Sequence, residues 1–192
     1  MSVLVCAGAG VRHGRRWVFR DLEILVEPGD LIAVTGPPGS GRTTALLALA
    51  GRFRLSEGSV DLVDAGAALG FVPGVTDPEP VMTVAEHIRE RRALLGLPKA
   101  DVPLLGLDPA AKGWQLSRFD RQLLGIVLAL MEEPQVIALD GIDEGLDAGE
   151  RRRLRQVLRE VAATGVAVIV TARHLGEGDE EQDEDFTTEV RL

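Results

Sequence analysis

The sequence is poor in three things that many proteins use heavily. It has a single cysteine, Cys6, so no internal disulfide can form, which fits a reducing compartment. It has no apolar run near the ~20 residues that a membrane helix needs, and its first residues lack the basic start of a signal peptide. Lysine occurs only as Lys99 and Lys112, and the other basic residues are arginine. We therefore expect a soluble, cytoplasmic chain that does not itself span a membrane.

The residues that are present suit one globular domain. The 192 residues, 45% of them apolar, are enough for a buried core and predict a single domain over 1–192. A formal net charge of -9 disfavours nucleic acid as a main partner, because an acidic surface repels phosphates. An acidic tail over about 176–186, GEGDEEQDEDF, is expected to be solvated.

Short apolar runs bounded by glycine and proline alternate with longer amphipathic stretches. These patterns predict strands at 3–8, 22–29, 30–36, 58–63, 68–73, 135–140 and 166–171, and helices at 43–51, 83–96, 117–133 and 148–165. The last residues, TTEVRL, predict a short closing strand. The alternation predicts a three-layer α/β sandwich with a largely parallel central sheet, a small antiparallel part and a short helical insert over about 75–116.

The stretch GPPGSGRTT, residues 36–44, has the spacing of a phosphate-binding loop between a buried strand and a helix. Its glycines let the chain turn tightly, so that backbone N–H groups converge on phosphate oxygens, and the helix N-terminus favours an anion. Thr43 offers a hydroxyl to a metal ion. The nucleotide-binding residues expected here are Gly36, Gly39, Ser40, Gly41, Arg42, Thr43 and Thr44.

Arg42 departs from the pattern, because such loops carry lysine at this position. Lysine is a compact point charge, whereas the arginine side chain is longer, planar and forked. Arg42 keeps the charge but is expected to crowd the terminal phosphates. The chain's general preference for arginine over lysine accounts for an arginine at position 42, but it does not show that the site tolerates one. We therefore expect weaker nucleotide binding than in a lysine-bearing loop.

The order of elements resembles the nucleotide-binding domain of ATP-binding cassette (ABC) transporters. Residues 20–63, from RDLEILVEPGD through the phosphate loop to LSEGSVDLV, look like that family's opening almost position by position. The resemblance runs from about residue 10 to 171. It implies the P-loop nucleotide-binding fold, with ATP and Mg²⁺ as ligands.

The segment QVIALDGIDEGLD, residues 135–147, matches the family's metal-aspartate strand and aspartate loop. The resemblance implies that Asp140 holds magnesium together with Thr43. Gly141, which has no side chain, stands at the position of the catalytic glutamate. Ala172 stands at the position of the switch histidine, with His174 two residues later.

Three further positions are read through the same resemblance. The nearest carboxylates to Gly141 are Asp143 and Glu144, and rescue by either would need an altered backbone. Gly74 replaces the glutamine of the family's glutamine loop. The adenine-stacking aromatic falls near His13, with Trp17 as a neighbouring candidate, although an exposed loop histidine is the simpler interpretation.

The family's signature motif falls at LSRFD, residues 116–120. Leu116 and Ser117 remain, but Arg118 and Phe119 replace two glycines whose bareness lets the backbone meet a partner's γ-phosphate. Asp120 adds a negative charge facing that phosphate. These replacements are expected to obstruct an ATP-driven homodimer.

The sequence therefore favours an ABC-type ATP-binding protein with weak or absent hydrolysis. It would serve as a subunit of a membrane transport or regulatory complex, at the inner face of the cell membrane. Its expected partners are a membrane permease subunit and a second nucleotide-binding chain. One alternative is an active ABC ATPase that uses replacement residues or a competent partner chain. A small-molecule kinase with the same loop is a third reading, disfavoured because no arginine-rich lid segment is present.

Overall fold

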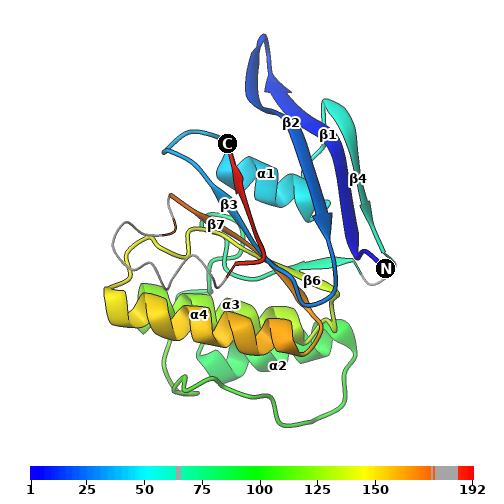
Figure 1. The fold of residues 1–192 in the computed structure, drawn as a ribbon. Helices are drawn as coiled ribbons and strands as arrows, with labels where there is room; N and C mark the ends of the chain where they lie inside the picture. The colour runs from blue at the N-terminus through cyan, green and yellow to red at the C-terminus, as the bar shows by residue number, and fades with distance from the viewer. Residues whose placement is uncertain (64–65, 174, 176–185) are drawn as a thin grey trace.

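Two sheets, with helices between and beside them, make up the computed structural model, which describes residues 1–63, 66–173, 175 and 186–192 (Figure 1). The strands are β1 (Leu4–His13), β2 (Arg16–Val26), β3 (Leu31–Thr35), β4 (Glu57–Leu62), β5 (Ala67–Leu69), β6 (Val136–Leu139), β7 (Ala167–Ala172) and β8 (Thr188–Arg191). The helices are α1 (Arg42–Leu49), α2 (Val84–Leu95), α3 (Arg118–Leu130) and α4 (Ala148–Ala163), with a 3-10 turn at Gly113–Gln115.

The larger sheet is parallel and has the strand order β5-β6-β7-β3-β8. In its centre β3 pairs with β7 from Leu31↔Val168 to Thr35↔Ala172. Residues of β3, β6 and β7 are buried at every position, as expected for strands covered on both faces. Because all five strands run the same way, the ends of β3, β6 and β7 lie at one edge of the sheet, which is where ligands bind in open α/β folds.

The smaller sheet is antiparallel, with the order β2-β1-β4. Helix α1 lies between this sheet and the parallel sheet (Figure 1). Side chains from all three layers form one apolar cluster, which includes Leu4, Phe19, Leu46 and Ile169. The antiparallel sheet thereby holds α1, and the loop that precedes it, against the end of β3.

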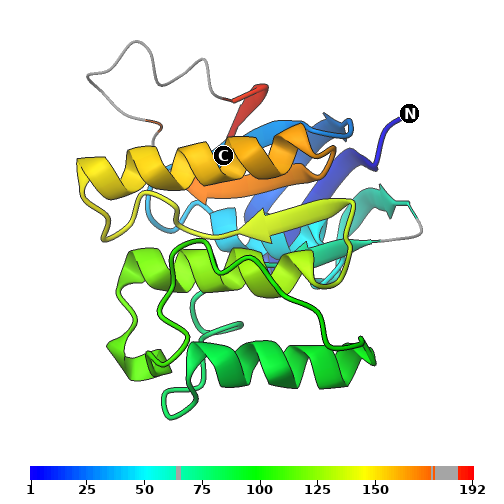
Figure 2. The same ribbon diagram turned by 90° about the horizontal axis from the view of Figure 1, so that it is seen from below.

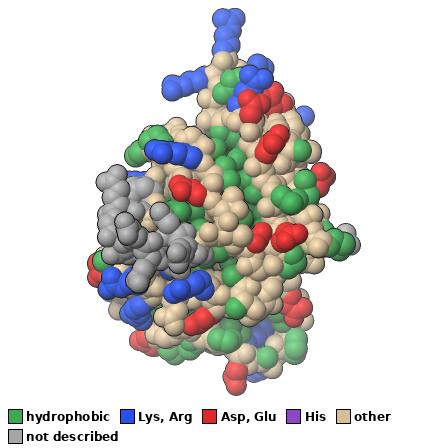
Figure 3. All heavy atoms as spheres, in the orientation of Figure 1, with side chains coloured by type: hydrophobic (Ala, Val, Ile, Leu, Met, Phe, Trp, Pro, Cys, Tyr) green, Lys and Arg blue, Asp and Glu red, His purple; other side chains and the backbone are tan. Residues whose placement is uncertain are grey.

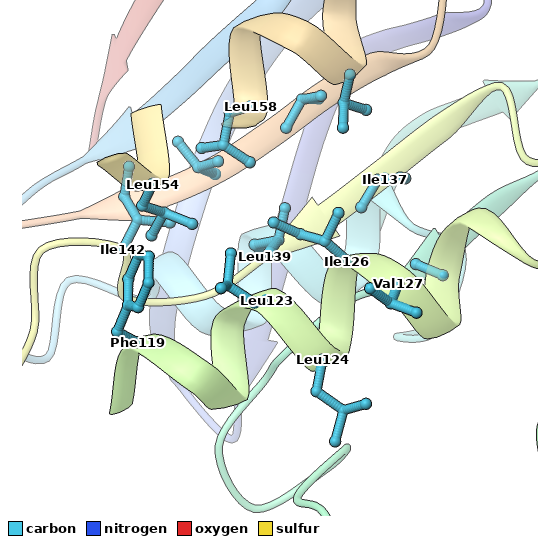
Figure 4. Close-up of a cluster of buried hydrophobic side chains, with 14 of the residues drawn as sticks. Phe119, Leu123, Leu124, Ile126, Val127, Ile137, Leu139, Ile142, Leu154 and Leu158 are labelled. Atoms are coloured by element: carbon cyan, nitrogen blue, oxygen red, sulfur yellow. The ribbon is translucent and has the colours of Figure 1, made fainter. Parts of the chain in front are cut away.

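Helices α4 and α3 cover the other face of the parallel sheet, and α2 packs on α3 (Figure 2). Each begins at a residue whose side chain accepts a hydrogen bond from the N–H three residues later, and whose own N–H is bonded in return. The capping residues are Thr83, Ser117 and Asp147. Figure 4 shows the apolar faces of α3 and α4 meeting over β6. No helix in the described part of the chain is long and apolar enough to cross a membrane.

The expected α/β fold with its antiparallel part is confirmed, and the differences are local. The strands expected at 3–8 and 22–29 are longer, because 4–13 and 16–26 form one hairpin in which the polar turn Gly14–Arg15 is short. The strand expected at 68–73 ends at Leu69. Phe186 is buried rather than solvated, and the rest of the acidic tail and His174 lie outside the described residues.

Candidate functional site

The phosphate loop joins the end of β3 to α1, as its spacing predicts. Gly41, the residue before the helix, has a φ of 94°, and a Cβ there would lie 2.7 Å from Val18 Cγ1 and 2.9 Å from the Val18 carbonyl oxygen. Only glycine fits both the conformation and the close approach to β2. No side chain caps the N-terminus of α1, so its first N–H groups remain available to an anion.

Two buried polar atoms of the loop have no hydrogen-bond partner among the described residues. They are the Ser40 hydroxyl and Nη1 of Arg42. Buried polar groups are nearly always paired, so such unpaired donors indicate a site that a polar ligand completes. Both atoms belong to the segment expected to hold phosphate, and a phosphate group supplies acceptors for both. The chain's own residues therefore fit a nucleotide phosphate.

A second cluster lies beside the loop, at the end of β6. The Thr43 hydroxyl donates to Asp140 Oδ2 over 2.9 Å, and the Thr171 hydroxyl at the end of β7 donates to Asp140 Oδ1. The Gln122 amide on α3 donates to the Asp140 carbonyl oxygen over 2.9 Å. Magnesium usually takes one or two protein oxygens together with water and substrate phosphates. The oxygens of Thr43 and Asp140 lie together and fit such a pair, while Thr44 follows in the same helical turn.

Thr171 and Gln122 were not predicted as site residues. Both are almost wholly buried, with exposed fractions of 1% and 0%. Each orients Asp140 rather than facing solvent. A threonine at the end of the strand next to β6 is a usable signal for Thr171, because strand ends share one edge of the sheet. Gln122 lies within an apolar helical pattern that gives no such signal.

Gly141 is buried and adopts a φ of 62°, with its N–H donating to the Thr171 hydroxyl over 2.8 Å. A Cβ at this position would lie 3.3 Å from Arg118 Nη2 and 3.4 Å from Glu144 Cδ. The space of a side chain at Gly141 is therefore already bordered by a guanidinium and a carboxylate.

The two carboxylates that follow Gly141 take different positions. Asp143 accepts the backbone N–H of Arg173 through Oδ2 over 3.0 Å, and its other oxygen is buried without a partner among the described residues. Glu144 Oε1 lies 3.3 Å from Arg42 Nη2. Glu144 therefore contacts the phosphate loop. Rescue of catalysis by Asp143 or Glu144, which is expected to need an altered backbone, stays a prediction. Ala172, the last residue of β7, is buried and carries no group that could contact a phosphate.

The signature segment differs from its expected orientation. Phe119 is 6% exposed and points into the core toward Ile142, so it does not obstruct a facing chain (Figure 4). Arg118 folds back over the Phe71 ring, with its guanidinium carbon 4.7 Å from the ring centroid. Asp120 accepts both the N–H and the hydroxyl of Ser117, so its charge serves the helix start rather than a phosphate. The expected steric block by Phe119 is thus wrong, because its side chain is part of the domain's own core.

The remaining predicted positions are His13, Trp17 and Gly74. His13 is exposed at the end of β1, in the hairpin tip where basic side chains gather (Figure 3). The Trp17 ring lies near two arginines, with its centroid 5.6 Å from the guanidinium carbon of Arg12 and 5.0 Å from that of Arg20. Gly74 forms an exposed turn in which its N–H donates to Asp77.

The strand, the glycine loop and the uncapped helix, with a hydroxyl and a carboxylate at the adjoining strand end, define a phosphate-loop nucleotide-binding domain. Residues 19–142 match the family model described as ABC transporter. The chain is 33% identical over 187 residues to the zinc import ATP-binding protein ZnuC of Jannaschia sp. (strain CCS1), which covers 91% of this chain and 74% of that protein. It is 30% identical over 181 residues to the taurine import ATP-binding protein TauB of Escherichia coli O157:H7, covering 86% and 71%.

Solved structures agree in fold. The ATP-binding subunit of an ABC transporter superposes with a TM-score of 0.79 at 19% identity, over 100% of this chain and 86% of that one. The ATP-binding cassette MJ1267 in its ADP conformation superposes with a TM-score of 0.77 at 22% identity, over 92% and 83%. The family-model match and the relatives at 30–33% identity show that this chain belongs to the ABC transporter family, as a nucleotide-binding domain.

Proposed function

We propose that this chain is the ATP-binding subunit of an ABC import system, and that alone it binds ATP with Mg²⁺ but hydrolyses it weakly or not at all. One contrast carries the proposal. The Thr43 hydroxyl and Asp140 Oδ2 lie 2.9 Å apart beside a phosphate loop with unpaired donors. In contrast, Gly141 stands at the position that the resemblance assigns to the catalytic glutamate. Import is proposed because relatives at 30–33% identity are named as zinc and taurine import proteins.

The residues would share the nucleotide as follows. The backbone N–H groups of the loop and of the first turn of α1 would bind phosphate oxygens, with the Ser40 hydroxyl and Arg42 as side-chain donors. Thr43 and Asp140 would hold magnesium, which when bound neutralises charge on the phosphates. Thr171 and Gln122 keep Asp140 in place for that task.

Hydrolysis needs a group that positions and polarises water. Gly141 has no such group, and Ala172 cannot contact a phosphate from the neighbouring strand. Loss of general-base assistance typically costs ~10²–10⁴-fold in rate. We therefore expect phosphate release near background from the isolated chain.

The test is a calorimetric titration of ATP with and without Mg²⁺, run beside a phosphate-release assay. We expect binding that strengthens with Mg²⁺, and Asp140→Asn should remove the Mg²⁺ dependence while leaving the slow release unchanged. Robust Mg²⁺-dependent release that Asp140→Asn abolishes would overturn the proposal of weak hydrolysis.

A second candidate is an active ATPase with a replacement carboxylate. The observation in its favour is Glu144, whose Cδ lies 3.4 Å from the Cβ position of Gly141. In that case Glu144→Gln should abolish a measurable rate. A kinase is not favoured, because the chain matches the ABC transporter family over most of its length.

The partners we propose are a membrane permease subunit, which would keep the chain at the inner face of the cell membrane, and a second nucleotide-binding chain. A cleft of about 380 Å³ between residues 69–82, α2 and α3 is bordered by the exposed side chains of Val75 and Leu94 and by charged side chains that include Glu90 and Arg121. We propose it as the docking site of a permease segment that has both apolar and charged residues.

We still expect no ATP-driven homodimer, because Arg118 and Phe119 stand in place of the two signature glycines, whose bareness the backbone contact with a partner's γ-phosphate requires. Light scattering with ATP and Mg²⁺ that shows a tight homodimer would contradict this.

A further inference from the structure

Three charged side chains meet between the phosphate loop and the end of β7. Glu144 Oε1 lies 3.3 Å from Arg42 Nη2 and 3.4 Å from Arg173 Nε. The three residues come from the phosphate loop, the segment after β6 and the residue after β7. Two guanidinium groups share one carboxylate oxygen, so the cluster carries a net positive charge.

The Glu144 carboxylate pairs with only some of the guanidinium donors in this cluster. The Arg42 side chain is only 11% exposed, and its Nη1 is buried and has no partner among the described residues. A buried cationic donor without an acceptor is costly. A phosphate group has more acceptor oxygens than the single one that Glu144 offers, and arginine pairs with it through two parallel hydrogen bonds.

Arg173 is placed to take part in nucleotide binding. Its carbonyl oxygen accepts the N–H of Gly36, the first residue of the phosphate loop, over 3.4 Å, and its own N–H is held by Asp143. Its backbone is therefore tied to both loops of the site, while its side chain is 53% exposed and pairs with Glu144. It follows Ala172, so its guanidinium supplies a charge where the end of β7 otherwise has none.

We infer that the Glu144 carboxylate occupies the place of the terminal phosphate between Arg42 and Arg173, and that Arg173 is a phosphate-binding residue that distinguishes ATP from ADP. This inference rests on the proposed function, since it requires that the chain binds ATP. ATP displaces Glu144 from both guanidinium groups. ADP has no third phosphate to reach them, so it binds without competing with Glu144.

Two substitutions with opposite expected effects distinguish this inference from a purely structural role of Arg173 and Glu144. Arg173→Ala should weaken ATP binding about tenfold and change ADP binding less than twofold. Glu144→Gln keeps the shape but removes the competing charge, so it should tighten ATP binding about threefold and leave ADP binding unchanged. A gain in affinity cannot come from a damaged fold.

The measurement is calorimetric titration of ATP and ADP, each with Mg²⁺, on the full chain and on three variants. The control is Arg191→Ala, which removes one positive charge from β8, the strand beside β3, and leaves the Glu144 ion pairs intact. It should change ATP and ADP affinity equally and by less than twofold.

The possible results separate the two proposals. Equal effects of Arg173→Ala on ATP and ADP, or weaker ATP binding by Glu144→Gln, would overturn the inference while leaving nucleotide binding in place. If neither ATP nor ADP binds to the full chain or to any of the variants, the proposed function is overturned, and the inference with it. ATP-selective loss in Arg173→Ala, together with ATP-selective gain in Glu144→Gln, supports the inference.

Discussion

The phosphate loop at 36–44 and the segment at 140–147 border the same site but are built differently. The loop depends on its backbone: glycine turns, an uncapped helix start and a close approach to Val18. The segment after β6 depends on side chains: Asp140 with its hydrogen bonds, the bare Gly141, and Glu144 in ion pairs. The first region has the parts that hold a phosphate. In the second, a glycine follows Asp140, and under the proposed function this glycine leaves no side chain to polarise water.

This difference indicates that nucleotide binding depends mainly on the backbone of the loop, whereas hydrolysis depends on side chains. Backbone N–H groups bind an anion whatever side chains surround them, provided that the turn forms. Catalysis needs several side chains held at once around the reacting atoms. Under the proposed function, Gly141 and Ala172 therefore leave the site without two catalytic groups, while the turn at 36–44 is undisturbed.

The largest expected effect tests the backbone half of the comparison. Gly41→Ala should destabilise the protein by about 3 kcal/mol or more, because the new Cβ would meet Val18 atoms at 2.7 and 2.9 Å and the φ of 94° is strained. Gly39→Ala is the matched control: its φ is 82° but no atom lies within 4 Å, so only the conformational cost of ~1–2 kcal/mol applies. Urea unfolding measures both, and equal losses would show that the contact with β2 is unimportant.

The next effect tests the side-chain half. Gly141→Glu should leave phosphate release near background, because Arg118 Nη2 and Glu144 Cδ border the new side chain at 3.3 and 3.4 Å and the φ of 62° disfavours any residue but glycine. The readout is steady-state phosphate release, with circular dichroism to show that the variant is folded. A rise of ~100-fold, the scale of one general base, would show that this single position blocks hydrolysis.

A smaller effect sharpens the boundary between the two regions. Arg42→Lys should tighten ATP binding about fivefold, because lysine keeps the charge, occupies less space beside the phosphates and releases Glu144. Arg52→Lys, an exposed residue beyond α1, is the control and should leave the affinity unchanged. Titration calorimetry is the measurement, and equal or weaker binding by Arg42→Lys would show that the loop has adapted to arginine.

The smallest effect concerns the sheet that supports the loop. Burial raises the pKa of the Cys6 thiol on β1, so the folded state favours the neutral thiol more than the unfolded state does. The resulting stability is present below the unfolded pKa of a thiol, ~8.5, and is lost as the pH rises through the raised pKa. The chain has no tyrosine, so few other groups titrate in this range. Cys6→Val should flatten the decline in unfolding free energy as the pH rises above about 8.5, and an unchanged decline would exclude Cys6 as its source.

Local chemistry in the sequence determined much of this molecule. The phosphate loop is recognisable because its glycines, its hydroxyls and the flanking strand and helix are neighbours in the chain. Helices α2, α3 and α4 begin at Thr83, Ser117 and Asp147, where a capping side chain and its partner lie three residues apart. Signals of this range do not require the rest of the fold, so the expected boundaries of these helices held to within a few residues.

The tertiary structure alone decided how the altered positions are used. Phe119 and Arg118 are adjacent in the chain, yet one enters the core and the other lies over Phe71, because burial depends on which face of α3 meets β6. Glu144 joins Arg42 across 102 residues and Arg173 across 29. Contacts at such separations depend on the packing of β3, β6 and β7 into one sheet, because only that packing brings the ends of three strands within reach of a single carboxylate.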